Sequence, residues 1–275
     1  MSEKYRVQAK VLSMEEISTD IFSLWMQSGE IAAAARPGQF VSLYCDDGSR
    51  ILPRPISLCE IDRDAGALRL VFRIAGAGTR ELSEKRAGDR IPVVGPLGNG
   101  FPLAKIATTA AAAVNSKTAA KQTVFLIGGG IGIPPLLELA KALTGRGCQV
   151  QAILGYRNSD TFLVEEFRAQ CEVFLATEDG SLGTKGNVLD AIRAHGLSAR
   201  VLCACGPTPM LRALKTYAVE RDMTAWLSLE EKMACGIGAC LACVCKTTEV
   251  DAHSQVKNKR VCKEGPVFEA REVEL

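Results

Sequence analysis

Five cysteines in the last fifty residues are spaced for metal ligation. Three of them share a short loop that reads Cys235-x4-Cys240-x2-Cys243, and eighteen residues separate Cys243 from Cys262. Three thiolates on one loop and a distant fourth match the spacing of plant-type [2Fe–2S] ligation. Two glycines inside the loop let the backbone curl toward the sulfurs and point N–H groups at them. The spacing therefore favours a [2Fe–2S] cluster with metal ligands at Cys235, Cys240, Cys243 and Cys262.

A zinc site and free buried cysteines are the alternatives to a cluster. A structural zinc site pairs two short knuckles, whereas here three candidate ligands share one loop, so iron–sulfur chemistry is favoured. Free buried cysteines are not expected at this density. Cys245 lies two residues past Cys243 and could replace Cys262, but a Cys-x-Cys pair strains cluster geometry. We therefore expect Cys245 to be a non-ligand.

Two glycine-bearing turns indicate a dinucleotide site. The segment VFLIGGGIGIPPLLELAKAL is typical of a strand, a glycine turn and a helix, and CACGPTPM ends a second strand in a similar turn. Free N–H groups at a helix N-terminus favour a pyrophosphate, and glycine lets it approach. The alternative is a pair of tight turns without a ligand. The expected dinucleotide contacts are Gly128, Gly129, Gly130, Gly132, Gly206, Pro207 and Met210.

Two further side chains border this expected site. Cys205 ends the strand before the second turn, where its thiol could lie against the nicotinamide ring in a catalytic position. Arg157 ends another strand at the edge that commonly meets the adenosine ribose. It could bind a 2′-phosphate, and a solvated surface arginine is an equal alternative.

A short motif in the first hundred residues suits a flavin. Arg54-Pro55-Ile56-Ser57 offers a fixed cation for a phosphate and a hydroxyl that can donate to a flavin ring nitrogen. Gly76-Ala77-Gly78-Thr79 is another glycine turn that opens a helical segment, which suits a pyrophosphate. Ordinary barrel turns would explain these residues equally well.

The composition is that of an ordinary folded protein. The chain has 275 residues, 47% hydrophobic and 23% charged, with a formal charge of +2. These values exclude a chain that is disordered throughout, a collagen and a coiled coil. The net charge is too small to attract nucleic acid or a membrane surface electrostatically. The polar start lacks the apolar core of a signal peptide, and no stretch offers about 18 uncharged apolar residues. We expect a cytoplasmic protein with no membrane or nucleic-acid partner.

The chemistry must be positioned by a multidomain β plus α/β fold. Short β-branched and aromatic runs predict strands at 5–12, 21–27, 40–45, 56–61, 68–74 and 90–94, and hence an N-terminal antiparallel β-barrel. From Thr123, apolar runs alternate with helix-like segments, which predicts a parallel sheet with helices on both faces. The expected domains are an FAD-binding barrel at 1–103, a low-complexity connector at 104–122, an NAD-binding α/β domain at 123–229 and a small [2Fe–2S] domain at 230–275.

The order of these motifs resembles a known family. The barrel Arg-x-x-Ser and Gly-x-Gly-Thr are followed by GPLGNGF, GGGIG, CGPxPM, MACGIGACLACVC and RVCKEGPVF. This order resembles the ferredoxin-NADP reductase superfamily, and within it the electron-transfer subunits of NAD-dependent (class 1B) dihydroorotate dehydrogenases. The resemblance covers essentially the whole chain, and the cysteine-rich tail is its most specific part.

The resemblance implies FAD, NAD and a [2Fe–2S] cluster as cofactors. It carries FAD contacts onto Arg54, Pro55, Ile56, Ser57, Val71, Phe72, Arg73, Gly78 and Thr79. The chain departs from the family pattern at Ile56, where an aromatic residue is often found. The Ala-rich 104–122 stretch looks like an insertion, and the spacing before Cys262 is slightly long.

The resemblance also implies a relay in pyrimidine biosynthesis. An FMN-containing catalytic subunit oxidises dihydroorotate, and electrons pass through the cluster and FAD to NAD⁺. A heterotetramer with two copies of each subunit is expected. The alternatives are a subunit of another NAD(P)H-dependent ferredoxin or sulfur oxidoreductase, a self-contained oxygenase reductase and a zinc-stapled interaction module. A plant-type ferredoxin domain would need far more than the last 45 or so residues, which counts against the oxygenase reductase.

Overall fold

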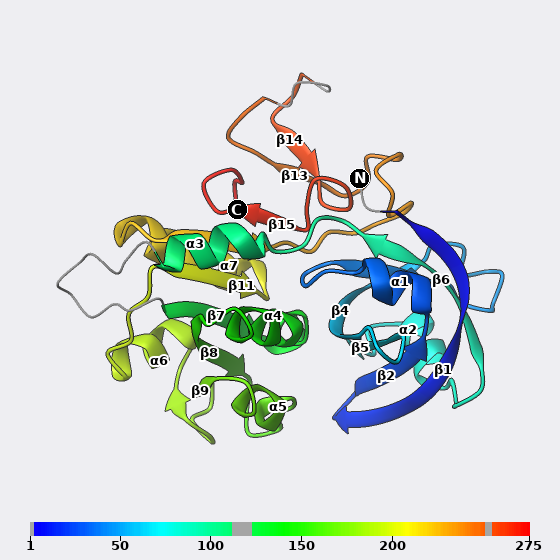
Figure 1. The fold of residues 1–275 in the computed structure, drawn as a ribbon, viewed down its shortest axis with the longest axis horizontal. Helices are drawn as coiled ribbons and strands as arrows, with labels where there is room; N and C mark the ends of the chain where they lie inside the picture. Colours follow the sequence, from blue (N-terminus) through cyan, green and yellow to red (C-terminus); the bar gives the residue numbers. More distant parts are fainter. Residues whose placement is uncertain (1–2, 112–122, 251–254) are drawn as a thin grey trace.

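The first part of the chain forms a closed antiparallel barrel. The computed structural model describes residues 3–111, 123–250 and 255–275 (Figure 1). The barrel strands are β1 (Tyr5–Ser18), β2 (Ile21–Gln27), β3 (Phe40–Leu43), β4 (Arg54–Asp62), β5 (Ala67–Arg73) and β6 (Arg90–Leu97), with the short helices α1 (Gly29–Ala34) and α2 (Ala77–Ser83). They close in the order β1-β2-β5-β4-β3-β6, and alternate side chains such as Leu24, Val41 and Leu70 fill the interior. The expected barrel is confirmed.

The second part of the chain forms a sheet in the order β10-β9-β8-β7-β11-β12-β15. Its strands are β7 (Thr123–Gly129), β8 (Gln149–Tyr156), β9 (Glu172–Thr177), β10 (Thr184–Lys185), β11 (Val201–Cys205), β12 (Thr224–Ser228) and β15 (Val267–Glu269). Every strand pair from β10 to β12 is parallel, as the strand–helix alternation predicts.

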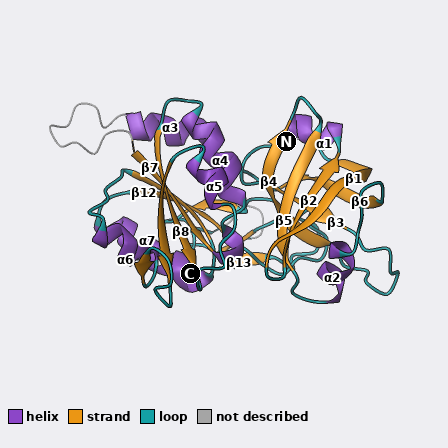
Figure 2. Ribbon diagram, turned by 90° about the horizontal axis from the view of Figure 1, so that it is seen from below, coloured by secondary structure: helices purple, strands orange, loops and turns teal. Residues whose placement is uncertain are grey.

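Helices cover both faces of this sheet (Figure 2). They are α3 (Leu103–Ala111), α4 (Pro135–Thr144), α5 (Val164–Arg168), α6 (Val188–Ala194) and α7 (Thr208–Glu220), with the 3-10 turn η2 at Gly130–Gly132. Val124 and Leu126 of β7 face one core with α3, α4 and α5, whereas Phe125 and Ile127 face another core with α6 and α7. The fully buried β7 is therefore a continuous apolar run.

The stretch expected to be a connector is partly helical. α3 begins at Leu103, and its Ile106 and Ala110 are buried against the sheet core. The remainder of that stretch, 112–122, lies outside the described residues. Every helix in the described ranges falls short of the length and apolar character that a bilayer span requires.

The C-terminal segment ties the barrel to the sheet. It contains the two-stranded ladder of β13 (Val244–Lys246) and β14 (Asn258–Arg260), and then β15, which pairs antiparallel with β12. At its other side, Asn99 follows the last barrel strand, and its side-chain amide donates to the carbonyls of Lys263 and Glu264 at 3.0 Å each. The pattern of the sequence did not predict β15, because three residues are too few to show a strand period.

A charged contact docks the barrel against α4. The buried Glu138 Oε2 on α4 accepts a hydrogen bond from the Ile61 backbone N–H at 3.1 Å, and its other oxygen lies 3.8 Å from Arg63 Nη1. Desolvation raises the pKa of the Glu138 carboxyl. Nearby, Glu60 on β4 pairs with Arg69 at 2.6 Å and with Lys141 of α4. These contacts hold the barrel against α4 and so set the orientation of the barrel relative to the parallel sheet.

Candidate cofactor sites

Backbone hydrogen bonds to sulfur link the four candidate ligands into two pairs. The Sγ of Cys235 accepts hydrogen bonds from the backbone N–H groups of Ala239 at 3.3 Å and Cys240 at 3.4 Å. The Sγ of Cys243 accepts one from the Cys262 N–H at 3.4 Å, and both of these residues are buried. Among the described residues, no three metal-ligating side chains converge on one point as a mononuclear site requires. Two thiolate pairs fit a two-iron cluster, in which each iron takes two cysteines.

The loop backbone favours an ionised Cys235. Burial opposes ionisation, but hydrogen bonds from the N–H groups of Ile237 and Cys240 outweigh it and lower the pKa of the Cys235 thiol to about 6. At the other pair, burial raises the pKa of the Cys262 thiol to about 12. The backbone N–H groups around Cys235 agree with the expected ligation, because hydrogen bonds to the sulfurs of such clusters set their reduction potential.

Cys245 lies apart from the two pairs. Its Sγ donates to the Lys259 carbonyl across the β13–β14 ladder at 3.5 Å. Burial raises the pKa of the Cys245 thiol to about 11. A protonated thiol with its own acceptor supports the prediction that Cys245 is a non-ligand.

Three of the expected flavin contacts, Arg54, Gly78 and Thr79, lie together at one side of the barrel. The Arg54 guanidinium lies against Gly78, where an added Cβ would be 2.1 Å from Nε. The Thr79 hydroxyl accepts from the Ala75 N–H at 2.8 Å and the Gly76 N–H at 3.2 Å, which holds this turn. A fixed cation beside a close-packed glycine turn fits a pyrophosphate.

The other expected flavin contacts differ in the way their side chains point. Phe72 is buried inside the barrel and stacks on Phe22 with 6.2 Å between ring centroids, so only its main chain can meet a ligand. Ile56 packs against the same barrel core. Val71 and Arg73 leave the opposite face of β5, toward the sheet. Pro55 and Ser57 are half-buried and lie across from Ser42 and Phe40 of β3.

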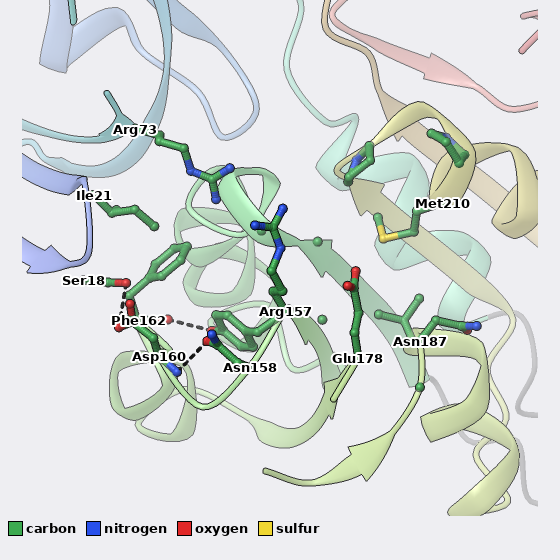
Figure 3. A pocket seen from close by; sticks show the side chains of 18 of the residues that line it. Ser18, Ile21, Arg73, Arg157, Asn158, Asp160, Phe162, Glu178, Asn187 and Met210 are labelled. Atoms are coloured by element: carbon green, nitrogen blue, oxygen red, sulfur yellow. Dashed lines mark hydrogen bonds between the residues drawn. The ribbon is translucent and has the colours of Figure 1, made fainter. Parts of the chain in front are cut away.

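A cavity of about 880 Å³ separates the barrel from the sheet (Figure 3). That volume lies in the range of small-molecule and cofactor sites. From the barrel come Ser18 to Ile21 and Arg73, and from the sheet come the ends of β7, β8 and β9 with the start of α7. The carboxyl ends of parallel strands are where α/β folds bind dinucleotides. Gly129, Gly130, Pro207 and Met210 line the cavity as expected.

The likeness of this chain to known proteins runs along its full length. It is 44% identical over 272 residues to the "Dihydroorotate dehydrogenase B (NAD(+)), electron transfer subunit" of Geobacillus kaustophilus (strain HTA426), covering 98% of this chain and 99% of that one. The protein of the same name from Bacillus velezensis is 43% identical over 267 residues, covering 96% and 97%. The chain belongs to the family of dihydroorotate dehydrogenase B electron transfer subunits.

Two further matches agree with this family. Residues 230–274 match the model of the iron-sulfur cluster binding domain of dihydroorotate dehydrogenase B. The solved structure of an NADH-dependent reduced ferredoxin-NADP oxidoreductase is 31% identical with a TM-score of 0.81, covering 98% of this chain and 90% of that one. The expected superfamily, the fold class and the cluster-binding tail are thereby confirmed.

In this electron transfer subunit, three of the expected NAD glycines are closely packed outside the cavity lining that the structure describes. Gly128, Gly132 and Gly206 do not line the cavity in the part of the chain that the structure describes. An added Cβ on Gly132 would lie 2.4 Å from the Cys205 carbonyl oxygen, and one on Gly206 would lie 2.5 Å from Met210 Cε. Gly132 and Gly206 let the two turns approach each other, whereas a Cβ on Gly128 would lie 2.7 Å from Ile133 Cγ1 within its own turn.

Cys205 is not among the cavity residues that the structure describes either. Burial raises the pKa of its thiol to about 12. The thiol is therefore protonated at neutral pH, and the residue is half-buried at the end of β11. A catalytic role for Cys205 stays a prediction, and the cavity lends it no support.

The sequence did not reveal the barrel's contribution to this cavity. Ser18 Oγ donates to Asp160 Oδ1 at 2.9 Å, and the Thr19 N–H lies 3.3 Å from Oδ2, so the β1–β2 turn closes one wall. Arg157 and Glu178 extend side by side into the same space (Figure 3). Arg157 follows a strand end that the sequence indicated, whereas the turn at Ser18 carries no ligand-binding pattern.

Proposed function

We propose that this chain carries electrons from a dihydroorotate-oxidising partner to NAD⁺ in pyrimidine biosynthesis. The observation that carries the proposal is the likeness to dihydroorotate dehydrogenase B electron transfer subunits along the whole chain. The bound cofactors supply the chemistry, since a [2Fe–2S] cluster exchanges single electrons and FAD exchanges a hydride with NAD⁺.

A different part of this chain binds each of the three cofactors. Cys235, Cys240, Cys243 and Cys262 bind the cluster. The β4 segment with Arg54, and the turn with Gly78 and Thr79, bind FAD. The cavity between barrel and sheet binds NAD. The distances at Arg54 and the two thiol pairs support these assignments.

The partner is an FMN-containing catalytic subunit, and the complex is a heterotetramer with two copies of each chain. The name of the relatives, an electron transfer subunit, requires a catalytic partner. We place the complex in the cytoplasm, because none of the eleven cysteines, all of which the structure describes, is in a disulfide, as expected in a reducing compartment.

Cofactor content tests the proposal first. The purified chain should be brown-yellow and contain about one FAD, about two iron atoms and about two acid-labile sulfides. Zinc without flavin would instead identify an interaction module. Co-purification from the native host, followed by mass spectrometry, identifies the partner and the stoichiometry.

The second candidate is a subunit of another NAD(P)H-dependent ferredoxin or sulfur oxidoreductase. The favouring observation is the TM-score of 0.81 to the NADH-dependent reduced ferredoxin-NADP oxidoreductase structure. Coupling of dihydroorotate oxidation to NAD⁺ by the purified complex decides for the first function. A complex that reduces ferredoxin and ignores dihydroorotate decides for the second.

A further inference from the structure

A hydroxyl beneath the cysteine loop has no hydrogen-bond partner. Ser42 on β3 is only 1% exposed, and its Oγ contacts neither solvent nor any donor or acceptor among the described residues. An unsatisfied buried hydroxyl costs about 1–3 kcal/mol, so such groups normally have a partner. The position of Ser42 indicates which partner this is.

Strand alternation places Ser42 on the outer surface of the barrel. Val41 and Leu43 point into the barrel core. Phe40, on the same face as Ser42, packs in one core with Cys243 and Cys262 of the cysteine set. The face that carries the hydroxyl is therefore the face that the C-terminal segment covers.

The cysteine loop presses directly on this hydroxyl. A Cβ added to Gly236 would lie only 2.9 Å from Ser42 Oγ, and Gly236 has a φ of +66°. Glycine is required here for both reasons, because any side chain would be strained and would meet the serine. Gly236 directly follows Cys235, whose Sγ already attracts two backbone N–H groups.

We propose that Ser42 Oγ–H donates a hydrogen bond to an anionic sulfur at the Cys235 end of the bound cluster. Ser42 is then a positioning and tuning residue supplied by the barrel, outside the cysteine-rich segment. It also lies directly across the β3–β4 ladder from Pro55 of the flavin segment. Ser42 thus lies between the cysteine loop, which is assigned to the cluster, and β4, which is assigned to FAD. This inference rests on the proposed function, because it requires the cluster.

A hydrogen bond to sulfur stabilises the more negative, reduced cluster and raises its reduction potential. Removal of the donor should therefore lower that potential. The full-length purified holoprotein is titrated electrochemically, with the cluster followed by electron paramagnetic resonance and the flavin by visible absorption. In Ser42→Ala the ratio of reduced to oxidised cluster at a fixed potential should fall about tenfold, a shift of about 59 mV. The flavin potential should stay unchanged.

Ser28→Ala is the matched control. Ser28 is another buried serine whose Oγ finds no partner among the described residues, and its backbone N–H donates to Gly66 at the β4–β5 turn. Its cluster potential should equal that of the unmodified protein. If Ser42→Ala fails to assemble, the isosteric pair Ser42→Thr and Ser42→Val isolates the hydroxyl, with the lower potential expected for Val.

The outcomes separate this inference from the function on which it rests. An unchanged cluster potential in Ser42→Ala, or equal potentials in the Thr and Val variants, overturns the hydrogen bond. A shift of the flavin potential alone also overturns it, because the acceptor would then be the flavin. Absence of any cluster signal from the unmodified protein contradicts the proposed function instead.

Discussion

At the scale of single residues, the buried cysteines Cys262 and Cys245 near the β13–β14 ladder should behave in opposite ways. Cys262→Ser should lose most of its cluster, because Cys262 is linked to Cys243 and completes the second thiol pair. Cys245→Ser should retain it, because the Cys245 thiol is bonded to the Lys259 carbonyl. Iron and sulfide analysis with visible spectra measures both. Loss in both variants, or in Cys245→Ser alone, contradicts the ligand assignment.

Glu178 should favour NADH over NADPH. Its side chain lines the cavity beside Arg157 and is exposed, and a carboxylate there repels a 2′-phosphate that Arg157 would otherwise attract. We expect Glu178→Gln to raise the ratio of kcat/KM for NADPH to that for NADH about tenfold, which corresponds to about 1.4 kcal/mol. Steady-state assays with an artificial acceptor measure the ratio.

The control for this change is Glu220→Gln at the end of α7, which does not line the cavity among the described residues. It should leave the ratio unaltered. A Glu178→Gln variant with the parent ratio would remove Glu178 from cofactor selection and leave the preference to other cavity residues.

At the scale of elements, β15 should support the sheet and the cysteine loop together. Phe268 is 2% exposed, pairs with Leu227 across the β15–β12 ladder and lies in one core with Cys243 and Cys262. Phe268→Ala should cost about 3–5 kcal/mol of unfolding free energy. It should also weaken cluster retention, since both depend on that core. Thermal unfolding with parallel iron analysis measures the two effects.

Val219→Ala on the exposed side of α7 is the matched control, because Val219 is 52% exposed. Its unfolding temperature should stay near that of the parent. Full cluster retention in a clearly destabilised Phe268→Ala protein would show that the loop is held independently of β15.

The sequence predicts a strand or helix where the element is long enough to show its hydrophobic periodicity. β7, with its seven buried residues, and the barrel strands β2 and β5 fall where the apolar runs place them. The glycine turns and the spacing of the cysteines are local patterns, so the sequence predicts them as well. The Ser18–Asp160 contact and the place of Ser42 under Gly236 are tertiary juxtapositions, and no local pattern encodes them. Cys205 shows the converse, because its position at a strand end does not reveal that it lies outside the cavity lining the structure describes or that the pKa of its thiol is raised.

At the scale of the whole molecule, the chain alone should oxidise NADH with an artificial acceptor and should leave dihydroorotate untouched. The cavity between barrel and sheet supports the first expectation. The second follows because the barrel, the sheet and the cysteine loop are each assigned to a cofactor. Assays with and without the catalytic subunit measure both reactions, and dihydroorotate oxidation by the isolated chain would refute the relay.

The place of β15 at the sheet edge bears on how the chain matures in the cell. β12 ends at Ser228, but the strand that covers it begins only at Val267 and so leaves the ribosome last of the seven. Until then the nascent chain displays a row of unpaired main-chain groups, which other chains can recruit into intermolecular sheets. The intervening segment is the one that must capture iron. Slow metal delivery would therefore lengthen the exposure of that edge, and iron starvation should appear as aggregated protein as well as colourless protein.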